Sequence, residues 1–521
     1  MQADKARNSY ITWETIVYGL ILIVAMMLRL YQVGTLPLQA SESSLAVSSW
    51  QMVQGQSPEN WEEPLVIDST SGIFFLFGDN DITARLIPAV LGTALVLLPW
   101  FLRGIIGKSG AVIAALLLAL SPSFIFFSRS LSGHIYVAML SLLLAIYLFR
   151  YVRGLHSALP LAVVVVLLFS SGAMGFNTII LFALSLAMLF ALGGGSNEIA
   201  KAFRAAWGER QNPTGYALLS LGLFLSISTG AFTHLERLGL PSLTAWLKAF
   251  DLSRAGEPWY WHLRLIAIYD PLIMVLGVLG TSYVLLKWKS DTENEGSSFQ
   301  IFLVFWAGVS LVLLALIGGK EAGQILSPLL PLTLLAGSLI GELARRLDSR
   351  SLHQAILPQR RESIALAVIA PLLGLGLIYS IHTTWSVSYK PGAMEWLHPC
   401  VTSPQVIEMA QAVEDISKGL PDPKAKVAVE SSIGQPFTWY LRHREKVEYV
   451  SKLTTGASMI IARPDEQTHK QLSGYTMHLR GALCTEWSRT PFNFRDFWHW
   501  LVYREGWGDQ RQIPVALYLR R

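Results

Sequence analysis

Apolar residues along the chain fill long uninterrupted blocks, rather than recurring at the spacing of an amphipathic helix or alternating as in a half-buried strand. Each block is roughly long enough to cross a hydrocarbon core of about 30 Å as a helix. The pattern predicts a polytopic α-helical membrane protein with about eleven spans. They lie near residues 14–31, 84–103, 110–127, 134–151, 158–174, 176–194, 215–232, 267–286, 300–318, 324–343 and 363–384.

The blocks at 158–174 and 176–194 allow two interpretations. Residues 170–175, Ser-Ser-Gly-Ala-Met-Gly, break the apolar pattern if the blocks are two helices. One long tilted helix is the alternative, and it would invert the orientation of every later segment.

The hydropathy pattern changes at Tyr389, where the long apolar blocks end. Short apolar runs at 426–429 and 458–462 are typical of buried parallel strands, and residues 404–416, with Pro404 at the start, are typical of a crossover helix. We therefore expect two domains: a membrane domain over residues 1–388 and a soluble α/β domain over residues 389–521.

Composition supports a membrane protein, because 52% of the residues are hydrophobic and only 15% are charged, against about 25% charged in soluble domains. The net charge of +5 is not evidence for nucleic-acid binding, since the Lys and Arg residues lie mainly between the apolar blocks. The first block has no small-residue cleavage site after it and is expected to be a retained helix.

The basic clusters predict the orientation. With eleven spans, most of them fall on one side of the membrane, which should be the cytoplasmic side. The N-terminus would be cytoplasmic. The extracytoplasmic side of the cell membrane would carry the segments 32–83 and 233–266 and the C-terminal domain. The clusters are Lys5/Arg7, Arg103/Lys108, Arg150/Arg153, Lys201/Arg204/Arg210, Lys287/Lys289 and Arg345/Arg346/Arg350/Arg360/Arg361.

Both cysteines, Cys400 and Cys484, lie in the C-terminal domain. Outside the cytoplasm a disulfide between them would persist. Two free buried thiols are the alternative, and a comparison of reduced and non-reduced masses distinguishes the two states.

The segment 32–83 between the first two spans is rich in acids, aromatics and prolines, which suggests that it lines a site. A solvated acidic loop is the alternative. Its candidate residues include Glu42, Glu62 and Glu63, and the further acids are Glu59, Asp68, Asp79 and Asp81.

Several short stretches of the chain match a known family in their order and spacing. In the membrane domain they are residues 29–38, 76–88, 119–129, 135–136, 258–261, 269–271, 328–332 and 335–337; in the tail they are 402–404, 439–442, 500–505 and 518–521. Together they resemble membrane glycosyltransferases of the GT-C fold, of the protein-mannosyltransferase and aminoarabinose-transferase type. The resemblance is greatest to the flippase-activity-associated family of archaeal and Chloroflexi-like glycosylation clusters, and it extends over nearly the whole chain.

The resemblance implies a transferase that uses a polyprenyl-phosphate sugar, with a first-loop carboxylate acting as general base or holding a divalent metal. Three positions depart from that pattern. Ser41 stands where the relatives have the Asp of an Asp-Glu pair, so Glu42 is the remaining candidate base. Glu63 stands where they have a His before Pro64, and His134 stands where they have an Asp.

A serine hydroxyl is no base near neutral pH without an activating partner, so these departures favour lost or altered catalysis. A rescue with Glu42 as base and Glu62, Glu63 or His134 rebuilding an acceptor or metal site is the alternative. No cluster has convincing metal-ligand spacing, so no cofactor is predicted beyond a divalent metal if the protein is active.

Three further residues, Arg85, Arg129 and Lys320, are charged at membrane depth or at its outer edge. Such residues are costly and usually functional, and contact with a donor phosphate would explain them. Snorkelling to the interface explains Arg85 and Arg129 equally well.

Two function hypotheses follow. One is an accessory or scaffold subunit of a membrane assembly, with a glycosyltransferase fold, impaired or absent catalysis, and protein partners. The other is an active transferase that uses Glu42 and a membrane lipid such as a polyprenyl-phosphate sugar. A secondary transporter is weaker, because the sequence shows no inverted repeat of broken helices.

Overall fold

A computed structural model describes residues 12–152, 158–192, 213–230, 240–251, 253, 256–288, 295–348, 360–390, 395–398, 400–419, 425–453, 456–487, 493–506 and 510–521. Eight of the basic residues used for the orientation lie outside these ranges: Lys5, Arg7, Arg153, Lys201, Arg204, Arg210, Lys289 and Arg350. The chain divides into two compact units, residues 1–31, 88–129 and 133–384, and residues 32–87, 130–132 and 385–521.

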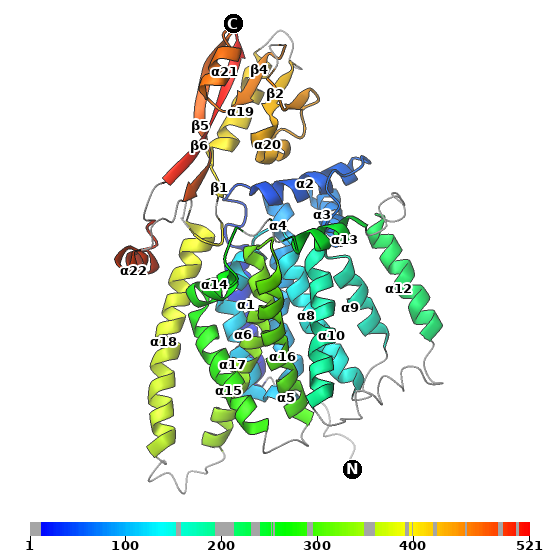
Figure 1. Cartoon of the computed structure of the whole chain (residues 1–521), viewed down its shortest axis with the longest axis vertical. Coiled ribbons are helices and arrows are strands. Elements are labelled where there is room, and N and C mark those ends of the chain that lie inside the picture. The colour runs from blue at the N-terminus through cyan, green and yellow to red at the C-terminus, as the bar shows by residue number, and fades with distance from the viewer. Residues whose placement is uncertain are drawn as a thin grey trace, which may run out of the picture. The chain divides into compact units, whose positions relative to one another are not determined.

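The first unit is helical, and every predicted apolar block coincides with a helix or with a pair of helices (Figure 1). The helices are α1 (Trp13–Leu30), α4 (Asp81–Leu97), η1 (Leu98–Leu102), α5 (Arg103–Ile106), α6 (Lys108–Leu120), α7 (Pro122–Ser128), α8 (Gly133–Val152), α9 (Leu159–Phe169), α10 (Ala173–Leu192), α12 (Pro213–Ser228), α13 (Leu240–Ala249), α14 (Trp261–Tyr269), α15 (Pro271–Trp288), α16 (Glu295–Leu316), η4 (Ala322–Ile325), α17 (Leu326–Asp348) and α18 (Arg360–Tyr389).

Six helical segments of the described chain are long and apolar enough to cross a membrane, or eight if each of two bent pairs is one span. Shorter apolar helices cover Pro64–Phe77, Leu159–Phe169 and Thr214–Ser228. The predicted count of eleven therefore remains a prediction, while a mostly helical, membrane-type bundle is what the structure shows.

The ambiguous region 158–194 forms two helices. α9 ends at Phe169 and α10 begins at Ala173, and the turn between them contains Gly172 at φ 91°. This left-handed backbone conformation is accessible to glycine at little cost, so the Ser-Ser-Gly sequence ends the first helix.

Two helices break at prolines. α7 begins at Pro122, with the Ser121 side chain accepting from the Phe124 N–H, and it bends by 60° from α6. α15 begins at Pro271 and bends by 110° from α14. The Asp270 carboxylate at the second break accepts from Ser121 Oγ at 2.5 Å and also from Ser123 Oγ, so the two breaks are bonded to each other.

Glycines let the central helices approach closely, as small residues do in membrane bundles. A Cβ at Gly337 of α17 would lie 2.6 Å from the Gly110 carbonyl oxygen of α6, and a Cβ at Gly280 of α15 would lie 2.5 Å from the Leu335 carbonyl oxygen. α6 and α15 each pack against α17 as a result (Figure 1).

The second unit contains a six-stranded mixed sheet in the order β1-β5-β6-β4-β2-β3. The strands are β1 (Cys400–Thr402), β2 (Val427–Glu430), β3 (Val447–Val450), β4 (Met459–Ala462), β5 (Tyr475–Trp487) and β6 (Gln510–Arg520). β2 and β4 pair in parallel, as predicted, whereas β5 and β6 form a long antiparallel pair that the sequence did not predict. Helices α19 (Gln405–Lys418), α20 (Gly434–Tyr440), α21 (Glu466–Gln471) and α22 (Phe494–Tyr503) complete it, with η5 (Ser431–Ile433).

One face of the sheet packs on α19, as the predicted crossover helix requires. Val406, Met409 and Val413 of the helix join Val427 and Ile461 in a buried cluster. Cys400 and Cys484 form a disulfide, with Cα atoms 5.6 Å apart, that links the paired strands β1 and β5.

The acidic segment 32–83 is largely helical rather than an irregular loop. It forms α2 (Ala40–Val53) and α3 (Pro64–Phe77), and its contacts place it in the same unit as the sheet.

Candidate functional site

The candidate base Glu42 is buried near the start of α2 and is saturated with hydrogen bonds. Oε1 accepts from Arg85 Nε at 2.9 Å and from the Leu131 N–H at 2.8 Å. Oε2 accepts from Arg85 Nη2 at 2.6 Å and from the Gln39 N–H at 2.9 Å, which completes a capping box. These four donors occupy the strong acceptor positions of the two carboxylate oxygens.

The guanidinium of Arg85 also has all of its hydrogen-bond donors in use. In addition to the two bonds to Glu42, Nη1 donates to the Val33 and Leu36 carbonyls at 3.0 and 2.7 Å, and Nη2 donates to the Pro37 carbonyl at 3.1 Å. These contacts use all five N–H donors of the guanidinium. The pair thus anchors residues 33–42 to α4, and Arg85 has no donor left for a lipid phosphate.

The other first-loop candidates lie apart from this pair. Ser41 is exposed, although its neighbour Glu42 is buried. Glu62 is exposed and its N–H bonds to Asn60, whereas Glu63 is half-buried as the residue that precedes α3.

Two acids of the segment 32–83 instead bond to the motif Trp439-Tyr440-Leu441-Arg442. Asp81 accepts from Trp439 Nε1 at 2.7 Å and from the Tyr440 hydroxyl at 2.9 Å. Asp79 accepts from Arg442 Nε at 2.6 Å. The motif and both acids were noted in the sequence, but nothing in the sequence predicted that they pair.

One acid of this segment has no such partner. Asp68 lies on α3, and its Oδ1 is buried with no hydrogen-bond partner among the described residues. Burial raises the pKa of its carboxyl to about 7. In the sequence Asp68 is one acid among several in this segment, because only burial distinguishes it.

Arg129 is buried and caps the C-terminus of α1. Its Nη1 donates to the carbonyls of Leu28, Arg29 and Tyr31 at 3.3, 3.2 and 2.6 Å. A cation is favourable at a helix C-terminus, where carbonyls lack intrahelical partners. This geometry gives Arg129 a structural contact at the end of α1, and the phosphate contact expected from the sequence stays a prediction.

His134 and Lys320 lie in the first unit. His134 Nε2 is 3.2 Å from a carboxylate oxygen of Glu321, whose side chain is 67% exposed. Gly323 gives the imidazole its space, because a Cβ there would overlap the ring. Lys320 Nζ donates to the Ile317 carbonyl at 2.5 Å, within its own turn.

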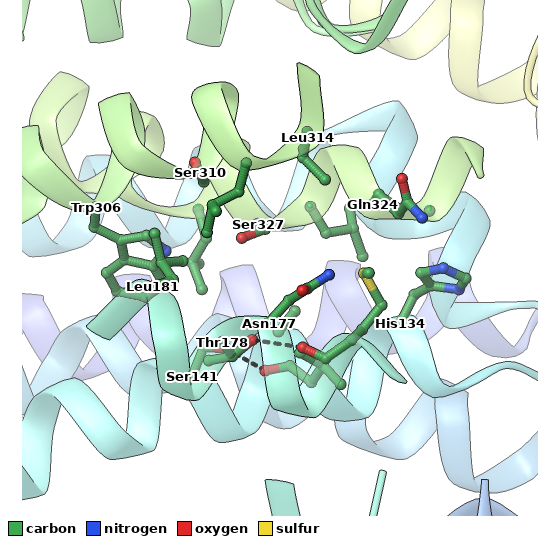
Figure 2. Close-up of a pocket in the computed structure, with 17 residues that line it drawn as sticks. His134, Ser141, Asn177, Thr178, Leu181, Trp306, Ser310, Leu314, Gln324 and Ser327 are labelled. Carbon is green, nitrogen blue, oxygen red and sulfur yellow. Dashed lines mark hydrogen bonds between the residues drawn. The ribbon is translucent and has the colours of Figure 1, made fainter. Parts of the chain in front are cut away.

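His134 also lines a cavity of about 500 Å³, measured as empty space that includes its opening (Figure 2). α8, α10, α16, η4 and α17 form its walls, and no Asp, Glu, Lys or Arg is among its lining residues. The polar lining residues are His134, Ser141, Asn177, Thr178, Trp306, Ser310, Gln324 and Ser327.

The Asn177 amide has a fixed orientation in this cavity. Its Oδ1 accepts from Trp246 Nε1 at 2.8 Å, and an indole nitrogen can only donate. Nδ2 must then point away from Trp246, and it has no partner among the described residues. Figure 2 shows the amide between Ser327 and His134. The cavity therefore offers uncharged hydrogen-bonding groups and no general base apart from His134.

The residues do not fit a divalent metal. Among the described residues, no three His, Cys, Asp or Glu side chains come together as ligands, and the best-placed acid, Glu42, already accepts four hydrogen bonds. We therefore assign no role to a metal.

Comparison with solved structures identifies the fold. ArnT from Cupriavidus metallidurans bound to undecaprenyl phosphate is similar, with a TM-score of 0.61 and 14% identity, over 98% of each chain. The chain has the GT-C fold. The apo oligosaccharyltransferase of Archaeoglobus fulgidus has a TM-score of 0.56 and 13% identity, over 88% of this chain and 70% of that one.

A third solved structure is the archaeal oligosaccharyltransferase AglB from Archaeoglobus fulgidus in complex with an inhibitory peptide and a dolichol-phosphate. Its TM-score is 0.53 at 15% identity, over 84% of this chain and 64% of that one. No protein-family model and no curated protein matches the sequence. Identities this low establish the fold and the membrane-protein class, and they leave the activity open.

Proposed function

We propose that this protein is a glycosyltransferase-fold membrane protein without transferase activity at Glu42, and that it acts as an accessory or scaffold subunit of a membrane assembly. The observation that supports this is the saturated Glu42 carboxylate. A general base needs a free lone pair within reach of the substrate proton, and all of the strong acceptor positions of Glu42 serve Arg85 and two backbone N–H groups.

The replaced residues support the same conclusion. Ser41 offers only a hydroxyl where the related enzymes have an Asp, and the cavity beside His134 has no carboxylate in its lining. In this proposal the protein belongs near the flippase-activity-associated family and spans the cell membrane about eleven times. Its N-terminus is cytoplasmic and its C-terminal domain extracytoplasmic.

The test compares cells that lack the protein with cells that regain the wild type or the Glu42→Gln variant. Gln keeps the size of the side chain but cannot act as a base. We expect Glu42→Gln to restore glycosylation as far as its folded amount allows, and native purification to recover a stoichiometric partner. Glu59→Gln, on an exposed acid of the same segment, is the matched control.

Two results would contradict the proposal. One is folded Glu42→Gln protein at wild-type levels that keeps its partner but loses glycan transfer. The other is wild-type protein that purifies without a partner and releases polyprenyl phosphate from a polyprenyl-phosphate sugar in proteoliposomes.

The second candidate function is an active lipid-linked-sugar transferase. What favours it is the similarity to undecaprenyl phosphate-bound ArnT over 98% of both chains. Its base would be Glu42, released from Arg85 by a rearrangement of residues 33–42. Donor consumption that disappears in Glu42→Gln would establish it.

A further inference from the structure

Helix α22 has two apolar faces, and the described part of the chain covers only one of them. On the inner face Trp500 is fully buried, stacked on Trp396 with ring centroids 5.7 Å apart and packed on Trp487 at 5.5 Å. On the outer face Phe494 and Trp498 are 71% and 57% exposed, and Val502 is exposed as well.

The outer residues are spaced for a single surface. Phe494, Trp498 and Val502 are at positions i, i+4 and i+8, so they form one stripe about 12 Å long on an α-helix. Arg495, His499 and Tyr503 are exposed beside the stripe. An apolar stripe flanked by basic and aromatic residues is typical of a helix that lies in the membrane interface.

A chain of buried contacts holds α22 next to the end of α18. Arg504, which ends α22, forms an ion pair of 3.2 Å with Glu395, and Glu395 accepts from Ser386 Oγ at 3.1 Å. Ser386 belongs to the last turn of α18. All of these residues lie in one unit, which fixes α22 to the last residues of α18.

The last turns of α18 carry exposed apolar side chains followed by aromatic ones, the pattern of a span that reaches the membrane surface. Leu375, Ile378 and Ile381 form an exposed apolar stripe within the predicted span 363–384. Just past that span comes Trp385, which is 61% exposed and stacks on Tyr389 with centroids 5.4 Å apart. Trp and Tyr are enriched where a span reaches the lipid headgroups.

We propose that α22 is an interfacial helix that inserts Phe494, Trp498 and Val502 into the bilayer next to the end of α18. A bilayer fits this surface better than a protein partner does, because Trp385 and Tyr389, in the same unit as α22, stand just past a predicted span, where aromatic side chains meet the lipid headgroups. The helix would fix the C-terminal domain to the membrane. This inference is independent of whether the protein is a transferase or a scaffold.

The test uses single cysteines in the full-length protein, since Cys400 and Cys484 are joined in a disulfide. Trp498→Cys and the control Asp415→Cys, an exposed position on α19, are labelled with an environment-sensitive fluorophore in phosphatidylcholine vesicles. We expect the label at 498 to shift to shorter wavelength and to lose about half of its emission when the lipids carry a quencher near the headgroup. The label at 415 should lose almost none.

A second variant tests the role of the stripe with substitutions that should not disturb the fold of the domain. Phe494→Ser with Val502→Ser changes only exposed side chains, so the domain should fold and keep its disulfide, while the quenching of the label at 498 falls to that of position 415. Two results would overturn the proposal: equal quenching at 498 and 415, or protection of the 498 label that depends on protein concentration, which would indicate a second copy or a protein partner.

Discussion

The Glu42 carboxylate and the Arg85 guanidinium form a two-bonded ion pair, with Nε to Oε1 at 2.9 Å and Nη2 to Oε2 at 2.6 Å. Both side chains are buried, and each completes its hydrogen bonding with backbone groups of residues 33–39 and 131. The residue that the sequence indicated as a base is therefore the centre of a structural network.

Removing one partner of this ion pair should lower the free energy of unfolding. Glu42→Ala leaves the Arg85 cation buried without its counter-ion, and removal of one partner of a buried pair costs about 3–5 kcal/mol. We expect a large fall in the unfolding temperature of the purified protein. Glu59→Ala, on an exposed acid of the same segment, should leave it unchanged; an equal fall in both variants would show that the network is not what stabilises this segment.

Asp68 should make stability depend on pH. Because burial raises its pKa to about 7, the folded protein holds this proton more tightly than the unfolded chain does. Stability should fall as the pH rises from about 4 to about 7, by on the order of 2 kcal/mol.

The Asp68→Asn variant isolates this effect, because an amide does not titrate. Relative to the wild type it should gain stability as the pH rises from 5 to 8, measured by thermal unfolding in one detergent at constant ionic strength. Parallel pH curves for the two proteins would refute the raised pKa.

The helices could be predicted from the sequence because a long apolar block has few alternatives in a membrane. The sequence allows either two helices or one at residues 158–194, and the structure has two, with Gly172 in a left-handed conformation at the break. The helices α2 and α3 were missed, since each has only 14 residues, shorter than a span, and α2 is also rich in polar residues.

The roles of the charged candidates could not be predicted from the sequence. A sequence shows that Arg85 and Arg129 lie near membrane depth, but their partners are mostly backbone carbonyls, which have no sequence signature. The hydrogen bond between the side chains of Asp81 and Trp439 could not be predicted for a different reason: it joins residues 358 positions apart, which only the fold brings together.

The disulfide should stabilise the sheet. Cys400→Ser with Cys484→Ser removes a link between residues 84 positions apart, and such a loss typically costs about 2–4 kcal/mol. We expect the non-reduced protein to be two hydrogen atoms lighter than the reduced one by mass spectrometry. The double variant should be cleaved faster by protease in the domain 389–521. Free thiols in protein purified without reductant would contradict the link.

Close packing of α6 on α17 should make Gly337 intolerant of a side chain. Gly337→Ala places a Cβ 2.6 Å from the Gly110 carbonyl oxygen, and overpacking of this kind costs about 1–3 kcal/mol. Gly308→Ala on α16 is the matched control, because a Cβ there meets nothing within 4 Å. We expect a lower unfolding temperature for the first variant only; tolerance of both would mean that the helices can separate at no cost.

The Arg129→Ala variant tests whether the Arg129 guanidinium stabilises the end of α1 or binds a phosphate. Arg129→Ala removes the donor shared by three carbonyls at the end of α1, and buried acceptors left unsatisfied cost about 1–3 kcal/mol. We therefore expect a lower unfolding temperature but unchanged binding of undecaprenyl phosphate at a temperature where the variant is folded. Lys248→Ala, on an exposed basic residue in the last turn of α13, controls for loss of charge and should change neither quantity. If Arg129→Ala instead kept wild-type stability and lost lipid binding, the guanidinium would serve the phosphate, and the capping of α1 would be incidental.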